Sequence, residues 1–198
     1  GRATRSPSFF LNTSLMNFLY AAQPTGTDIV SLSDMKEFLR VDHSDEDATI
    51  TAIIDSAVQS IQDYTGRHFK TTTYTATLDS FYNTEFPYQV DGVTTITYND
   101  RAGNPQTLDS SKYFSDVIRK PGRIKFKDTP DLEEDKFNRV AIVGAVTNSI
   151  NPPLTHAIKM LAAHYYENRR AVVVGTITAV IPLGIKAIIN PYRIISLK

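Results

Sequence analysis

The stretch that decides the fold is residues 45–66, which read DEDATITAIIDSAVQSIQDYTG. Apolar side chains recur there at positions i, i+3, i+4, i+7, i+8 and i+11, the spacing of one face of an α-helix. That face consists of Ile50, Ile53, Ile54, Ala57, Val58 and Ile61. Carboxylates precede it at the positive end of the helix dipole, and Gly66 can end the helix in the left-handed conformation. The sequence therefore predicts a long helix that buries one face.

A shorter helix is predicted immediately before this one. Ser31 and, three positions later, Asp34 form a typical N-terminal cap. The apolar residues that follow it, at helical spacing, are Leu32, Met35, Phe38 and Leu39. Residues 1–28, with Pro24 and Gly26, carry no such periodicity, so we expect an extended N-terminal arm there.

Helical periodicity returns near the C-terminus. Asn151 is followed by two prolines, which are favourable at the first positions of a helix, and residues 182–189 predict a short last helix closed by Asn190 and Pro191. We expect the two N-terminal and two C-terminal helices, residues 29–69 and 148–190, to form a helical bundle. Its predicted core is Ile50, Ile53, Ile54, Ala57, Val58, Ile61, Leu154, Ile158, Leu161 and Tyr165.

Residues 70–147, here called the β block, have a different composition. Nine threonines lie between Lys70 and Tyr98, and short β-branched runs alternate with turn signals about every ten residues. This pattern predicts an inserted antiparallel β domain of about five strands, at residues 70–78, 93–99, 112–118, 123–127 and 139–147. The strands do not alternate with helices, so the predicted fold class is α+β, and a doubly wound parallel sheet is disfavoured.

Composition excludes several functional classes. The 198 residues include 21 Lys and Arg, 21 Asp and Glu, and no Cys. Without Cys there is no thiol nucleophile, disulfide or cysteine metal site. A formal net charge of zero disfavours a protein that grips nucleic acid phosphates. No run of about 18 apolar residues occurs, so we expect no contact with a membrane through a spanning helix.

Catalytic motifs are absent from the sequence. It has no glycine-rich phosphate loop, no GxSxG and no HExxH. His164 and Glu167 share a helix face at i, i+3, a spacing used by carboxylate-bridged metal sites only when it is repeated on several helices. We therefore expect no catalytic residue, no metal and no cofactor, and predict that the protein is not an enzyme. The alternative from another class is a small enzyme or ligand-binding domain that uses His164 and Glu167.

Two parts of the chain resemble the head–tail connector, or adaptor, proteins of tailed bacteriophages. The first runs from residues 30–47, VSLSDMKEFLRVDHSDED, through the long helix to residues 63–67, DYTGR. The second comprises residues 153–169, PLTHAIKMLAAHYYENR, then PLGI at 182–185 and NPYR at 190–193. Together they frame residues 30–193, and the β block corresponds to a variable insert of some members.

The resemblance implies a structural protein of the virion neck. Members form a homo-oligomeric ring, commonly a dodecamer, beneath the portal protein, extend the DNA channel and carry the stopper or tail-completion protein. Genome DNA would pass through the lumen without specific binding, along an acidic or neutral lining for which residues 42–47 and 128–135 are candidates. Assembly would occur in the host cytoplasm. A stopper or tail-completion protein of the same connector is the nearer alternative.

The last residues form a candidate docking tail, residues 191–198. Asn190 precedes a proline and is thereby pushed toward extended geometry. The apolar, β-branched residues beyond it could be hidden by strand addition or insertion into a groove of the portal protein. The residues assigned to portal docking are Tyr192, Arg193, Ile194, Ile195 and Leu197. The competing interpretation is that this tail packs on its own bundle.

Overall fold

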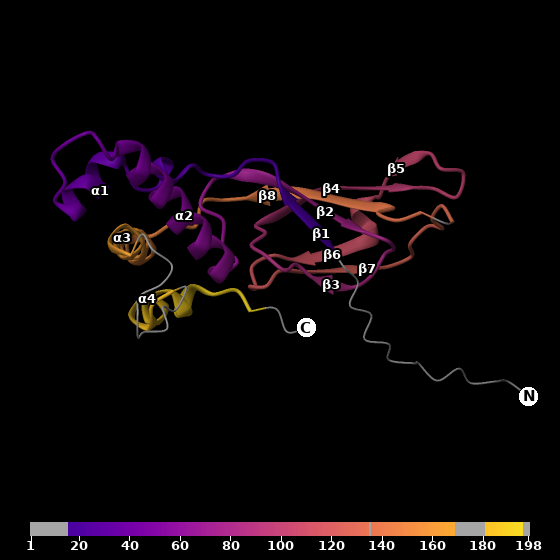
Figure 1. Cartoon of the computed structure of the whole chain (residues 1–198). Helices are drawn as coiled ribbons and strands as arrows, with labels where there is room; N and C mark the ends of the chain where they lie inside the picture. The colour runs from indigo at the N-terminus through magenta and orange to yellow at the C-terminus, as the bar shows by residue number, and fades with distance from the viewer. Residues whose placement is uncertain (1–15, 135, 169–180, 196–198) are drawn as a thin grey trace, which may run out of the picture.

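The computed structural model describes residues 16–134, 136–168 and 181–195 (Figure 1). Helices gather in one half of the molecule and strands in the other. The helices are α1 (Leu32–Leu39), α2 (Asp47–Thr65), α3 (Pro152–Glu167) and α4 (Leu183–Ile189). With the antiparallel sheets described below they make an α+β fold, as predicted. None of the helices in the described ranges is long and apolar enough to cross a membrane.

The local signals that predicted the helices are present in the structure. The Ser31 side chain accepts a hydrogen bond from the Asp34 amide at 3.1 Å and caps α1. Asn151 caps α3 in the same way through the Leu154 amide, with prolines in the first turn. Gly66 ends α2 in the left-handed conformation, at φ 68°. Helices α1 and α3 therefore begin where a side chain satisfies a free backbone amide, and α2 ends at a glycine that can adopt the left-handed conformation.

The strands form two antiparallel sheets rather than one. Sheet A has the order β1-β2-β8-β4-β5, and sheet B the order β3-β7-β6. The bounds are β1 (Asn17–Tyr20), β2 (Thr72–Leu78), β3 (Thr84–Glu85), β4 (Gly92–Asn99), β5 (Pro105–Thr107), β6 (Tyr113–Asp116), β7 (Arg123–Phe126) and β8 (Val140–Val146). The five predicted strands are β2, β4, β6, β7 and β8. The other three are short, and β6 and β7 leave the main sheet to cover its inner face.

The first strand departs from the expected N-terminal arm. Residues 17–20 pair with β2, with Tyr20 opposite Tyr74, so they form an edge of sheet A. Residues 26–28 form a short 3-10 turn, η1 (Gly26–Asp28), in which the Gly26 amide donates to Asp55 Oδ1 of α2 at 2.5 Å. A Cβ on Gly26 would lie 2.6 Å from the Asp55 nitrogen, so this close approach requires glycine. Within the described residues, the segment 16–28 thus spans both halves of the molecule.

Each half of the molecule has a hydrophobic core of its own. The helical core is built on the facing stripes of α2 and α3, with Met35 of α1 and Ile185 and Ile189 of α4. The second core lies between the two sheets and includes Tyr74, Ile96 and Ile142 from sheet A and Ile124 from sheet B. Each contains many fully buried large side chains, which is the main source of stability for folds of this size.

Candidate functional site

A cluster of buried polar side chains joins the two halves where α2 ends. Gln62, Thr65, His68 and Gln89 are each 5% exposed or less. These four residues, with Asp91, are called the joint below. Buried polar groups of this kind cost free energy unless they are hydrogen-bonded, so their partners define what the joint does.

The two glutamines of the joint bind backbone rather than each other. Gln62 Oε1 accepts from the Phe69 amide at 3.0 Å, and Gln89 Oε1 accepts from the His68 amide at 3.2 Å. Gln89 Nε2 donates to the Thr147 carbonyl at 2.9 Å and to Asp91 Oδ2 at 2.7 Å. Gln89 therefore ties the end of the helical half to the last strand of sheet A.

Asp91 extends the joint to the hairpin of sheet B. Lys120 Nζ lies 2.6 Å from Asp91 Oδ1, and the Thr147 amide and hydroxyl donate to Asp91 Oδ2. Burial alone raises the pKa of Asp91, but the hydrogen bonds from Lys120, Thr147 and Gln89 outweigh it and hold the pKa below its usual range. The carboxylate is thus kept ionised, and the ion pair fixes sheet B against sheet A.

His68 links the joint to the N-terminal strand. Its ring stacks on Tyr20 of β1 with centroids 4.0 Å apart, and Nε2 donates to the Ala22 carbonyl at 3.0 Å. Burial lowers the pKa of His68, and the bond to Ala22 opposes that effect only in part. Burial also raises the pKa of Tyr20, so both rings stay neutral near pH 7.

The start of the C-terminal tail lies against the end of α2. Asn190 is not extended as expected but helical, at φ −52° and ψ −43°, because a short 3-10 turn, η3 (Asn190–Tyr192), follows α4 directly. The Ile194 amide donates to the Thr65 carbonyl at 2.7 Å, and Arg67 Nε donates to the Tyr192 carbonyl at 2.5 Å. The Arg193 guanidinium lies 5.2 Å from the centre of the Tyr64 ring. Ile194 is 8% exposed, whereas Ile195 is 58% exposed. Of the residues assigned to portal docking, Tyr192, Arg193 and Ile194 contact their own bundle, Ile195 faces solvent, and Leu197 lies outside the described residues.

The residues assigned to the bundle core occupy the interface between α2 and α3. Eight of them are buried with at most 2% exposure: Ile50, Ile54, Ala57, Val58, Ile61, Leu154, Ile158 and Leu161. Ile53 and Tyr165 are partly buried and pack against the same cluster. They lie at its margin, where the Tyr165 hydroxyl can reach Ser60 Oγ at 3.3 Å.

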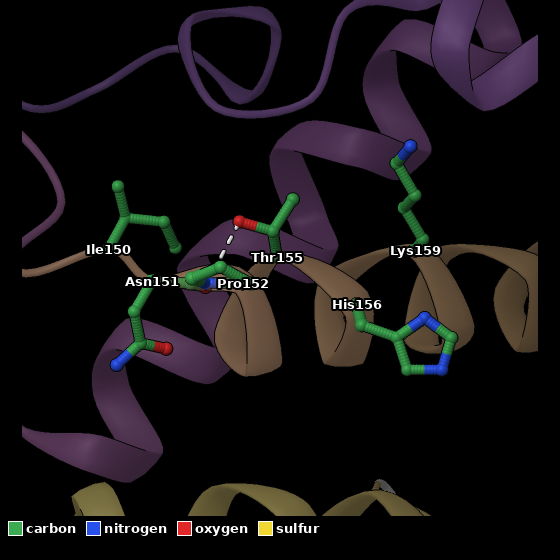
Figure 2. A pocket seen from close by; sticks show the side chains of 6 residues that line it. All are labelled: Ile150, Asn151, Pro152, Thr155, His156 and Lys159. Atoms are coloured by element: carbon green, nitrogen blue, oxygen red, sulfur yellow. Dashed lines mark hydrogen bonds between the residues drawn. The ribbon is translucent and has the colours of Figure 1, made fainter.

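An open hollow of about 520 Å³ lies at the start of α3. Figure 2 shows the six side chains that line it. Its lining is Ile150, Asn151, Pro152, Thr155, His156 and Lys159. Thr155 Oγ1 donates to the Asn151 carbonyl, and His156 and Lys159 stand at the edge without converging on a common point. His164 and Glu167, the residues of the enzyme alternative, are not part of this lining. In the described ranges no three His, Asp or Glu side chains come together as a metal site.

Sequence reasoning missed the joint. His68 and Gln89 lie 21 residues apart in segments without a motif, and their spacing does not predict the hydrogen bond between them. A weak signal exists in retrospect: an uncharged polar residue, Gln62, sits on the apolar face of the long helix. Such a residue needs a partner, but the sequence does not say which.

Comparison with known families finds one that part of the chain resembles. The model of the family described as phage gp6-like head–tail connector protein matches residues 29–120, a little under half of the chain. This match confirms the resemblance stated from the sequence, and residues 29–120 are similar to that family. The match spans α1, α2 and strands β2 to β6, and it does not extend to β1, α3 or α4. A comparison with curated protein sequences finds no match.

Solved structures with the same fold come from gene transfer agent (GTA) particles. A chain in the neck of an empty GTA particle, computed with C6 symmetry, has a TM-score of 0.69 at 20% identity, over 92% of this chain and 97% of that one. A chain in the virion of a native GTA particle has a TM-score of 0.68 at 22% identity, over 93% and 97%. A third, from a native neck computed with C12 symmetry, has a TM-score of 0.65 at 19% identity, over 92% and 97%. At these identities the likeness establishes a shared fold along nearly the whole chain, including the part outside the family match.

Proposed function

We propose that the protein is a structural connector of a tailed phage or phage-like particle, located in the neck between head and tail. The observation that carries the proposal is the agreement of two independent comparisons: the head–tail connector family over residues 29–120 and neck chains of similar fold over 92% of the chain. The proposed role is that of an adaptor, and among the described residues no group of three His, Asp or Glu forms a metal site.

The finer proposal is a homo-oligomeric ring beneath the portal protein, with a stopper or tail-completion protein on its other side. Relatives of similar fold come from necks computed with C6 and C12 symmetry, which supports a dodecamer. Closed rings need two different faces on each subunit that fit each other. DNA would slide through the lumen, and a formal net charge of zero suits a channel that must not retain the genome. We also propose that the connector has no enzymatic activity.

The docking of the C-terminal tail to the portal protein remains a proposal, in a narrower form. Hydrogen bonds from Arg67 and to Thr65 anchor residues 192–194 to the bundle. The exposed Ile195 is therefore the first residue available to a partner. The anchored part would present whatever follows it at a fixed place near the end of α2.

Electron microscopy of the purified protein, alone and mixed with the portal protein of the same particle, tests the proposal. We expect rings coaxial with the portal ring and a density for each subunit that fits the fold in Figure 1. Binding to the far end of a connector already built by another protein would instead identify a stopper or tail-completion protein. A failure to associate with the portal or with a connector in any form would contradict the neck assignment.

A further inference from the structure

The β6–β7 hairpin carries a basic surface that the zero net charge conceals. Residues 112–127 contain six Lys and Arg but only one acidic residue, Asp116. Three of the six bases are engaged: Lys120 with Asp91, Arg123 with Asp116 and Arg119 with Glu85. Of the remaining three, Lys125 and Lys127 lie exposed at alternate positions along and just beyond β7. In the described part of the chain, no ion pair joins either of these two to a carboxylate.

Large apolar side chains are exposed on the same hairpin. Phe114 of β6 pairs in register with Lys125 and is 61% exposed, with Lys127 Nζ 4.9 Å from the centre of its ring. Ile118, in the turn between the strands, is 95% exposed. DNA phosphates are bound by polar and charged groups, so an exposed isoleucine and phenylalanine would contribute little to such a surface. An apolar centre with charged residues around it is typical of protein interfaces. These features favour a protein partner with an acidic surface.

The other half of the molecule offers a surface of the opposite kind, here called the α1 corner. It comprises the exposed face of α1 and the loop after it, with Asp34, Glu37, Asp42 and Asp45 exposed. Phe38 projects from the same helix and is 42% exposed. Arg40 and His43 are the exposed bases in this corner, with His43 3.9 Å from Asp45, and Lys36 is occupied by Asp47 at 2.7 Å. The α1 corner is therefore acidic with one apolar side chain, complementary in charge to the hairpin.

These two surfaces belong to different halves of the chain. Figure 1 shows α1 at the end of the helical half and sheet B within the β half. Two complementary surfaces placed apart on one molecule produce head-to-tail contacts between copies, and these contacts form a ring when the rotation from copy to copy closes. We propose that the basic face of the β6–β7 hairpin of one copy binds the α1 corner of the next copy. This inference rests on the proposed ring and assigns the lateral contact within it.

The contact gives the acidic loop a role different from the one expected from its sequence. Residues 42–47 were a candidate for the channel lining; here they face a neighbouring subunit. Oppositely charged surfaces steer encounter and fix register, and Phe114, Ile118 and Phe38 supply the apolar area that holds the contact. Association through such a surface weakens as salt screens the charges.

Charge reversal with rescue tests the contact. The variant Lys125→Glu/Lys127→Glu should lower the fraction of protein in rings about tenfold, and combining it with Asp42→Lys/Asp45→Lys should restore rings. Native mass spectrometry and electron microscopy, with and without the portal protein, give the readout. The control Arg101→Glu/Lys136→Glu makes the same charge change at exposed loop residues and should leave rings intact. Circular dichroism verifies that each variant is folded.

The outcomes separate this inference from the proposed function. If the wild type and the variant Lys125→Glu/Lys127→Glu form rings equally well, the hairpin contact is wrong and the connector role stands. If the variant still forms rings but no longer binds the portal protein, the hairpin is a portal-binding surface and the lateral contact is wrong. If the variant still forms rings but loses only its affinity for duplex DNA, the hairpin binds DNA and the lateral contact is again wrong. If the wild type forms no ring, alone or with the portal protein, both the connector role and the lateral contact are contradicted. Loss of rings in Lys125→Glu/Lys127→Glu and their return in the combined variant support the lateral contact.

Discussion

Two buried residues at the centre of the bundle set its stability. Ile54 and Leu161 are fully buried on the facing stripes of α2 and α3. Replacing either with alanine should lower the free energy of unfolding by roughly 2–5 kcal/mol, because the cavity cannot collapse completely between two helices. The free energy of unfolding is measured by urea denaturation, with circular dichroism as the signal. Thr49→Ala, at an exposed position of α2, should change stability by less than about 0.5 kcal/mol. Small effects for both core variants would mean that the bundle core lies elsewhere.

His68 should make stability depend on pH. Its pKa in the folded protein is lowered by burial, so the unfolded chain, with a pKa of about 6.5, takes up the proton first on acidification. The contribution of neutral His68 is therefore fully present above about pH 6.5 and is lost as the pH falls toward the folded pKa.

The substitution His68→Gln tests that dependence. It should flatten the fall in melting temperature between about pH 7.5 and 5.5, a range that brackets the unfolded pKa. Thr49→Ala, at an exposed position that does not titrate, is the control and should leave the slope unchanged. An identical slope in wild type and His68→Gln would assign the pH dependence to other groups.

At the scale of elements, the anchored and exposed parts of the C-terminal tail can be separated by truncation. Ending the chain after Ile194 keeps the bonds to Thr65 and Arg67 and should leave the melting temperature unchanged, while attachment to the portal protein is lost. Ending it after Asn190 removes those bonds as well and should lower stability. Thermal melting and co-sedimentation with portal rings measure the two effects. If the chain that ends after Ile194 still attaches normally to the portal protein, docking by this tail is contradicted.

The elements that the sequence predicted well are those specified locally. Periodicity and caps identified all four helices because Ser31, Asn151 and Gly66 act on backbone within a few residues. Strand β1 was missed because β2, its partner among the described residues, lies more than fifty residues away, and an edge strand so far from its partner carries no local signal. The division into two sheets is likewise a property of pairing between whole strands, and β6 and β7 carry no local signal that excludes them from sheet A.

The candidate site was less predictable than the fold. The tail was recognised as apolar, but only the structure assigns Ile194 to the bundle and Ile195 to solvent. The joint depends on His68 and Gln89, which meet through the arrangement of whole elements. The basic hairpin was hidden in a sequence whose total charge is zero, because opposite charges reside in different parts of the fold.

At the scale of the whole molecule, the joint should make the two halves unfold together. Gln89→Ala leaves the His68 amide and the Thr147 carbonyl without their buried partner, which should cost roughly 1–3 kcal/mol. Because Gln89 connects the two cores, calorimetry should show one transition for the wild type and a broadened or double transition for the variant. Gln106→Ala, at an exposed residue of β5, should have little effect. A simple shift of one sharp transition in Gln89→Ala would show that other contacts couple the halves.

The β block enters and leaves the helical half at a single place. The His68 carbonyl accepts from both the amide and the hydroxyl of Ser149, and the Asn148 amide donates to Thr71 Oγ1, so the two junctions lie side by side. An ancestor without the block could have bridged this gap with a short turn, and lineages could exchange the block while the helices stayed in place. One condition limits such exchange: any replacement must still offer an edge to residues 17–20, which reach it from outside.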